Sequence, residues 1–140
     1  MTNIGKKSPP SMDEWLKEVK SDAQAAREGM YLVHNGVVRE TPKARVRLGD
    51  EDAAPVSGME FCYDAQKVEE AISETREMKG IFHVRVWLNE GRLEVGDDIM
   101  FVLIGGDIRP NVIDALQFLV ARIKTECVTE VELQEKNPGL

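Results

Sequence analysis

The stretch IMFVLIGGDIRPNVIDALQFLVARIK, residues 99–124, decides the fold class. Residues 99–106 form an apolar run that is typical of a strand buried on both faces or lying in an interface. Pro110 then suits the first turn of a helix. Apolar residues at helical spacing follow as far as Lys124, namely Val112, Ile113, Leu116, Leu119, Val120 and Ile123. The stretch therefore predicts a buried strand followed directly by an amphipathic helix.

Helices and strands are mixed along the rest of the chain. A short helix is predicted after Ser11, which suits an N-cap with Glu14 at the capping-box position. Further elements are predicted as a short helix within 22–29, a strand at 30–40 with a bulge or turn near Gly36, a strand at 59–64, a helix at 65–78, a strand at 81–88 and a closing strand at 128–133. This order predicts an α+β fold with a mixed, mainly antiparallel sheet.

The length of 140 residues fits one domain. Residues 1–10 are polar and contain two prolines, so they are predicted to be a flexible leader, and residues 11–140 a single domain. Residues 40–58 form the longest predicted loop, with a short strand at 44–48.

The formal net charge is -7, which argues against a nucleic-acid-binding protein. No apolar run approaches the roughly 18 residues of a membrane helix. The N-terminus has no apolar segment of the secretory type, so a cytoplasmic location is predicted.

Metal and phosphate-loop signatures are missing from the sequence, and neither a metal nor a cofactor is predicted. His34 and His83 are isolated and are interpreted as strand-face histidines. Cys62 and Cys127 have no metal spacing and are interpreted as free thiols. Cys127, three residues past Lys124, is either an ordinary buried thiol or a sulfur relay or substitute nucleophile.

Three cations stand at element boundaries: Arg39 after a strand, Arg109 at the entry to the last helix, and Lys124 at the edge of its apolar stripe. Two readings stay open from spacing alone. Lys124 is a surface lysine with its stem along apolar surface, or the three form an anion-binding cluster in which lysine adds chemistry.

The chain resembles the large, catalytic subunit of molybdopterin synthase, the MoaE family. The resemblance rests on an ordered set of motifs: GVVR at 36–39, a turn with Gly91, Leu93, Gly96 and Asp97, the strand IMFVLIGG, Arg109 in place of the arginine of a His-Arg pair, and Ala115 with Lys124 along the helix.

The resemblance implies an α/β-hammerhead-like α+β fold and a homodimer. It implies a MoaD-like, ubiquitin-fold partner that carries a C-terminal thiocarboxylate, and sulfur transfer to cyclic pyranopterin monophosphate. Lys124 would be catalytic. Arg39 and Arg109 would bind the phosphate and the carrier tail, with Arg109 serving the neighbouring subunit's pocket.

The sequence departs from the family pattern at two expected site positions. Ile108 stands where the family has a histidine, and Val131, within VTEVEL at 128–133, aligns with its second active-site lysine. These departures leave an alternative: a non-catalytic relative that acts as a dimeric binding module for the carrier tail. An unrelated fold with chance matches is a third possibility.

Overall fold

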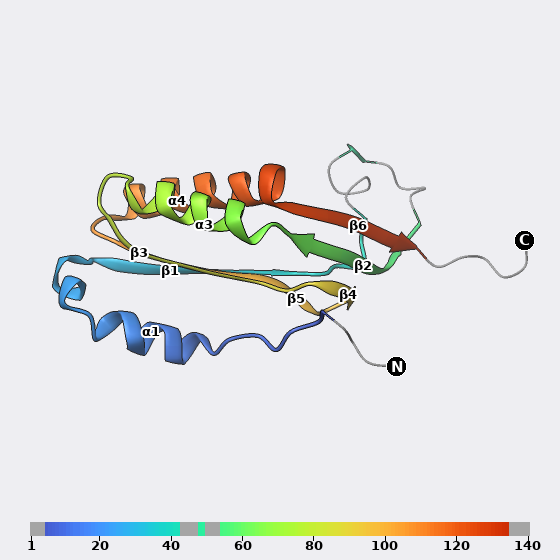
Figure 1. Ribbon diagram of the computed structural model, residues 1–140, viewed down its shortest axis with the longest axis horizontal. Helices are drawn as coiled ribbons and strands as arrows, with labels where there is room; N and C mark the ends of the chain where they lie inside the picture. The colour runs from blue at the N-terminus through green and yellow to red at the C-terminus, as the bar shows by residue number, and fades with distance from the viewer. Residues whose placement is uncertain (1–4, 43–47, 50–53, 135–140) are drawn as a thin grey trace, which may run out of the picture.

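The computed structural model describes residues 5–42, 48–49 and 54–134. The described elements alternate between helix and strand (Figure 1). They are α1 (Met12–Lys20), a short 3-10 helix η1 (Ala23–Arg27), β1 (Met30–Val37), β2 (Val56–Tyr63), α3 (Ala65–Arg76), β3 (Ile81–Leu88), β4 (Gly91–Glu94), β5 (Asp98–Gly106), α4 (Arg109–Arg122), a π-helical turn η2 (Ile123–Cys127) and β6 (Val128–Gln134).

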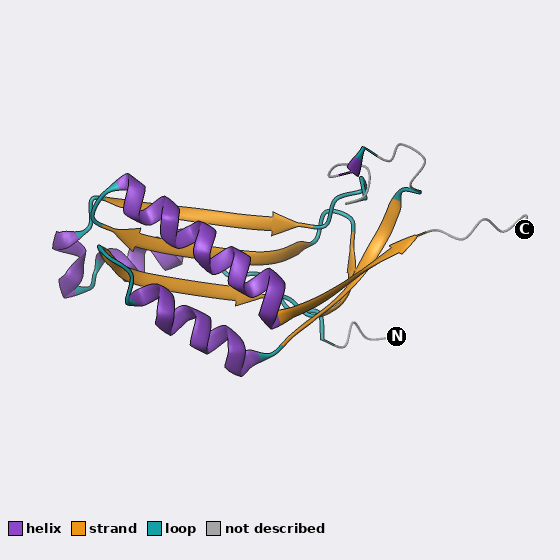
Figure 2. Ribbon diagram, turned by 90° about the horizontal axis from the view of Figure 1, so that it is seen from above, coloured by secondary structure: helices purple, strands orange, loops and turns teal. Residues whose placement is uncertain are grey.

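The strands form two three-stranded sheets, in the orders β1-β5-β3 and β4-β2-β6. All the pairings between described strands are antiparallel. Seen from above, α3 and α4 lie across the first sheet, and the second sheet extends from its end (Figure 2). The α+β class is thus confirmed, with two antiparallel sheets in place of one mixed sheet.

Strand β5 is buried on both faces, as its apolar run predicts. Because side chains alternate along a strand, Val102 and Ile104 share one face and join the core cluster that includes Leu119 of α4. Leu103 points to the other face, where α1 contributes the buried Val19. Figure 1 shows α3 and α4 above the sheet and α1 below it. Each fully buried aliphatic side chain here stabilises the fold by about 1.5–3 kcal/mol.

The helices begin where the sequence indicates. The Ser11 side chain accepts a hydrogen bond from the backbone N–H of Glu14, and Pro110 stands in the first turn of α4. The predicted apolar face of α4 is correct except at Ile113, whose side chain is 38% exposed. Within the described ranges, the helices are too short or too polar to cross a membrane.

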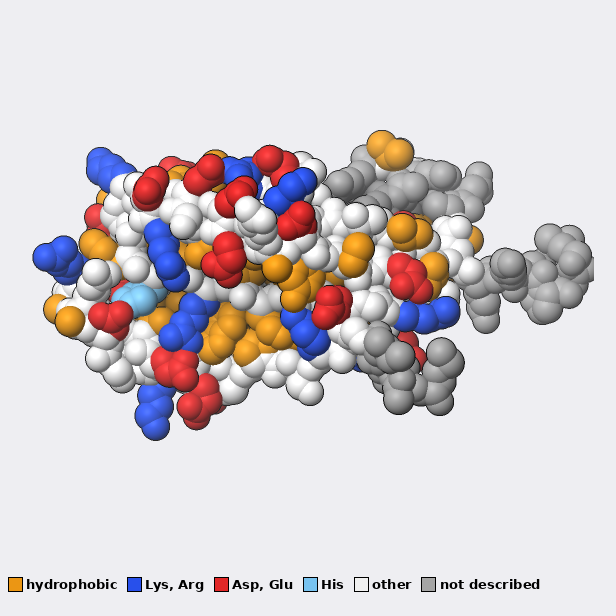
Figure 3. Space-filling view, in the orientation of Figure 1, with side chains coloured by type: hydrophobic (Ala, Val, Ile, Leu, Met, Phe, Trp, Pro, Cys, Tyr) orange, Lys and Arg blue, Asp and Glu red, His pale blue; other side chains and the backbone are white. Residues whose placement is uncertain are grey.

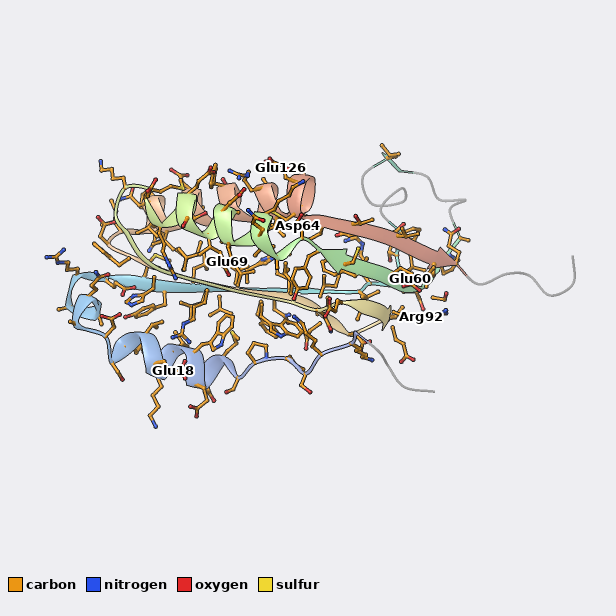
Figure 4. The ribbon with its side chains drawn as sticks, in the orientation of Figure 1. Glu18, Glu60, Asp64, Glu69, Arg92 and Glu126 are labelled. Carbon is orange, nitrogen blue, oxygen red and sulfur yellow. The ribbon has the colours of Figure 1, made fainter. Side chains whose placement is uncertain are left out.

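Strand β4 was not predicted, because Gly91–Glu94 lies in a turn-rich segment and takes strand form only by pairing with β2. Glu60 and Arg92 stand opposite each other in that pairing, on the exposed side of the second sheet (Figure 4). Strand β2 begins at Val56, so residues 56–58 of the predicted loop are strand. The strand predicted at 44–48 lies almost wholly outside the described residues.

The described part of the predicted leader contacts the rest of the chain. The backbone N–H of Lys7 donates to Asn89 Oδ1 at 2.7 Å, and Lys7 Nζ donates to the Tyr63 hydroxyl at 2.8 Å. Lys6 pairs with Asp97 at 2.7 Å. These contacts join the segment to the turns at the strand ends.

Candidate anion-binding site at the end of helix α4

A hollow of about 240 Å³ lies where β1, β2, β5 and β6 meet the π turn that follows α4. We call it the Lys124 hollow. Its polar lining among the described residues is His34, Arg39, Lys124, Glu130 and Glu132. Its apolar lining includes Met59, Ile99 and Met100. The site thus gathers groups from distant parts of the sequence.

Lys124 is positioned by the π turn Ile123–Cys127. Ile123 and Cys127, at the ends of this turn, are 0% and 4% exposed, while Lys124 between them is exposed. The buried ends fix the turn against the core and direct the amine to the hollow. Single π turns within helices occur often at functional sites. The sequence places Lys124 at the edge of the apolar stripe, and the structure places it at the rim of this hollow.

Arg39 follows a bulge in β1, at the register shift between Gly36 and Val37. Val38 is 2% exposed and anchors the backbone, and the next residue, Arg39, lines the hollow. Its Nε donates to the Thr41 carbonyl at 2.8 Å. That bond orients the guanidinium and does not use its two terminal nitrogens, which suit a phosphate or carboxylate.

His34 is a site residue that the sequence analysis interpreted only as a strand-face histidine. Its face of β1 opens into the Lys124 hollow. Burial, followed by the positive charge of Lys124, lowers the pKa of the imidazole below its usual value. The available signal was the strand period of two, which puts His34 on the same face as Gly36 of the GVVR motif.

The face of β6 that meets the hollow is acidic. Glu130 and Glu132 stand opposite the buried Phe61 and Met59 of β2 and line the hollow. Val131 stands opposite Glu60 and is 51% exposed, so it points to the other side. Successive side chains of a strand point to opposite faces, so Val131 and its two glutamate neighbours face opposite sides of β6. The position that aligns with the family's second lysine therefore points away from the hollow.

Arg109 lies at the opposite end of α4 from Lys124. The helix rises about 1.5 Å per residue, which separates the two backbone positions by roughly 22 Å. Arg109 is exposed and is not among the residues that line the hollow. Ile108, beside it, is 55% exposed. A single chain therefore brings together two of the three predicted cations, Arg39 and Lys124.

Cys127 is buried, and burial raises the pKa of its thiol. A protonated, enclosed thiol is a poor nucleophile, which favours the buried-thiol reading over the sulfur relay. Within residues 5–42, 48–49 and 54–134, no three histidine, cysteine or carboxylate side chains are grouped to hold a metal.

Solved structures of low sequence identity share the fold. A molybdopterin synthase from Staphylococcus aureus superimposes with a TM-score of 0.71 at 18% identity, over 93% of this chain and 89% of that one. A MoaE protein from Burkholderia ambifaria gives 0.65 at 17% identity, over 95% and 90%. A chain from the complex of subunits 1 and 2 of molybdopterin-converting factor from Helicobacter pylori gives 0.60 at 16% identity, over 92% and 86%.

A family comparison identifies the chain more directly than these folds. No curated protein matches the sequence significantly. The family described as MoaE protein, however, matches residues 6–126, which is most of the 140-residue chain and includes Arg39, Arg109 and Lys124. The chain therefore belongs to the MoaE family, the family of molybdopterin synthase large subunits in molybdenum-cofactor biosynthesis, as a divergent member.

Proposed function

We propose that this chain is a catalytic large subunit of molybdopterin synthase. It would transfer sulfur from the thiocarboxylate C-terminus of a MoaD-like, ubiquitin-fold carrier to cyclic pyranopterin monophosphate. The observation that carries the proposal is the meeting of Arg39 and Lys124, which come from distant parts of the sequence, at one hollow.

The two cations of the hollow, Arg39 and Lys124, suit this chemistry. The substrate phosphate and the carrier thiocarboxylate are both anions, and a guanidinium binds such groups in a bidentate way. The Lys124 amine can stabilise negative charge that develops on the acyl oxygen during transfer. Arg39 would bind an anionic group, and Lys124 would stabilise the charge on the group that reacts.

The proposal includes a homodimer, and the place of Arg109 supports it. Since it lies roughly 22 Å along α4 from Lys124, a second copy of the chain would have to supply it to the same pocket. Most dimers are symmetric, so each subunit would then complete the other's site. A molar mass of one chain at working concentration, by light scattering, would exclude this part of the proposal.

The direct test mixes the protein with thiocarboxylated MoaD and cyclic pyranopterin monophosphate and measures molybdopterin by mass spectrometry. The dithiolene product holds two sulfur atoms, so two carriers should lose their thiocarboxylate for each molybdopterin formed. The matched control is Lys124→Ala. Absence of product with the unaltered chain and intact substrates would reject the proposal.

The second candidate is a non-catalytic, dimeric module that binds the carrier tail. It is favoured by the two carboxylates of Glu130 and Glu132, which line the hollow on the strand where the resemblance implies a lysine. It predicts carrier binding, measured by calorimetry, without any molybdopterin. Product formation rejects it, and loss of carrier binding rejects both candidates.

A further inference from the structure

We propose that His34 is a second catalytic residue of the Lys124 hollow, a general base that activates water during release of the sulfur carrier. This inference rests on the proposed function and adds to it a residue that the family motifs quoted above do not include. It is carried by the position of the side chain, by its lack of a partner and by the charges around it.

The first support is the room in front of the imidazole. His34 and Gly36 lie on the same face of β1, and a Cβ placed on Gly36 would lie 4.0 Å from His34 Nε2. The residue next to the ring on this face therefore contributes no side chain. His34 lines the same hollow as Arg39 and Lys124. A small molecule bound there can reach the nitrogen.

The second support is that the ring has no partner among the described residues. Across residues 5–42, 48–49 and 54–134, neither nitrogen of His34 takes part in a hydrogen bond or ion pair, although the side chain is half-buried. Buried polar groups in proteins are usually paired. An unpaired imidazole at the wall of a hollow is therefore available to water or to a ligand.

The third support is electrostatic. Lys124 of the π turn, Arg39 after β1, and Glu130 and Glu132 of β6 face the same hollow. Burial and the charge of Lys124 lower the pKa of His34. At neutral pH the ring is thus a free base beside a cation. A general base has to be unprotonated before it acts, and the cation can stabilise the oxyanion that forms nearby.

The step that His34 would catalyse is the hydrolysis that releases the carrier, and its atoms balance as follows from the two ends of the reaction. The carrier begins as a thiocarboxylate and ends as a carboxylate, so one oxygen atom has to replace the sulfur, and water supplies it. While the sulfur joins the carrier acyl carbon to the pterin, a water oxygen bonds to that carbon and His34 takes a proton from the water. The carbon–sulfur bond breaks with its electron pair on sulfur. The imidazolium proton then passes to that sulfur, which gives a thiol and a carboxylic acid with no oxidant or reductant.

The experiment compares single-turnover molybdopterin formation by the unaltered chain, His34→Gln and His34→Ala between pH 5.5 and 9. His83→Gln serves as the matched histidine control, with circular dichroism to verify folding. His34→Gln should reduce the rate at pH 7 by roughly 10²-fold or more, the usual contribution of a general base. It should also abolish the loss of rate on acidification. Free imidazole should restore part of the rate of His34→Ala, which a purely structural role would not allow.

The outcomes separate this inference from the proposed function. If the unaltered chain makes molybdopterin and His34→Gln keeps both its rate and its pH profile, the inference is wrong and the proposed function stands. If His34→Gln is slow but keeps the acid limb, and imidazole does not help His34→Ala, the residue has a packing role and the inference is again wrong. If the unaltered chain makes no product, both are wrong.

Discussion

The two histidines of the chain lie on opposite faces of the same sheet, and their neighbours give them different roles. His83 on β3 is held between two carboxylates: Nδ1 contacts Glu28, and Nε2 lies 2.8 Å from Asp22. His34 on β1 lines the Lys124 hollow and has no such partner in the part of the chain that the structure describes. Both are strand-face histidines, as predicted. The comparison shows that the partners of a histidine, and not its strand position, separate a structural group from a reactive one.

The first of these regions, which we call the His83 clasp, consists of His83, Glu28 and Asp22. The Glu28 side chain is 0% exposed and lies over Gly105, where any Cβ would overlap the carboxylate. Burial raises the pKa of Glu28, and the hydrogen bond from His83 lowers the pKa of Asp22. The clasp thereby fastens the segment after α1 to the sheet.

On the face shown in Figure 3, apolar side chains form a band between charged groups above and below.

The largest expected effect lies in the hollow. Lys124→Ala should lower molybdopterin formation by roughly 10²–10³-fold, because it removes the cation placed to stabilise charge in the transition state. Lys17→Ala, an exposed lysine on α1, is the matched control and should keep full activity. Single-turnover rates at saturating substrate measure the effect. Equal rates for the two variants would show that Lys124 is a surface lysine.

The next effect lies in the clasp. His83→Ala leaves the buried carboxylate of Glu28 without its partner and should lower the free energy of unfolding by about 2–3 kcal/mol. His34→Ala removes no hydrogen bond between described residues and should cost less than about 1 kcal/mol. Urea unfolding followed by tryptophan fluorescence compares the two variants. A larger loss at His34 would reverse the assignment of roles.

The sequence predicted the long elements and the motif positions, since their periods and caps are local properties. The distance between Arg109 and Lys124 could also be predicted from the sequence, because the length of a helix follows from its residue count. Glycines at 105 and 106 are too little for a nucleotide motif. The structure explains them by close packing: Gly105 under Glu28, and Gly106 against Val112.

Tertiary contacts decided what the sequence could not show. Strand β4 forms only by pairing with β2, and no spacing of residues in the sequence predicts the π turn. The pairing of β6 with β2 shows which residues of VTEVEL face the hollow, so the motif alignment led to Val131 while the chain presents Glu130 and Glu132 there. His34 joined the site for a similar reason, because its neighbours in space come from α4 and β6.

A third, smaller effect tests which side chains of β6 face the Lys124 hollow. Glu132→Lys replaces a carboxylate on the hollow with a cation and should tighten binding of the anionic pterin phosphate by about tenfold, or 1.4 kcal/mol. Val131→Lys adds the same cation on the exposed face and should change the affinity by less than twofold. Calorimetric titration of both variants measures this. Tighter binding by Val131→Lys alone would place the second lysine at position 131, as the motif alignment has it, and would overturn the register argument.

The smallest effect is a pH dependence that belongs to His34. Its pKa in the folded chain is lowered by burial and by Lys124, whereas in the unfolded chain it has the usual value of about 6.5. As the pH falls below that value, the unfolded chain binds the proton first, so stability is lost between about pH 6.5 and the lower folded pKa. One proton gives a slope of at most about 1.4 kcal/mol per pH unit. Urea unfolding of both proteins from pH 7.5 to 5 should show the unaltered chain losing stability relative to His34→Gln as the pH falls, because glutamine carries no such proton. Parallel curves would mean that His34 titrates alike in both states and is not enclosed beside Lys124.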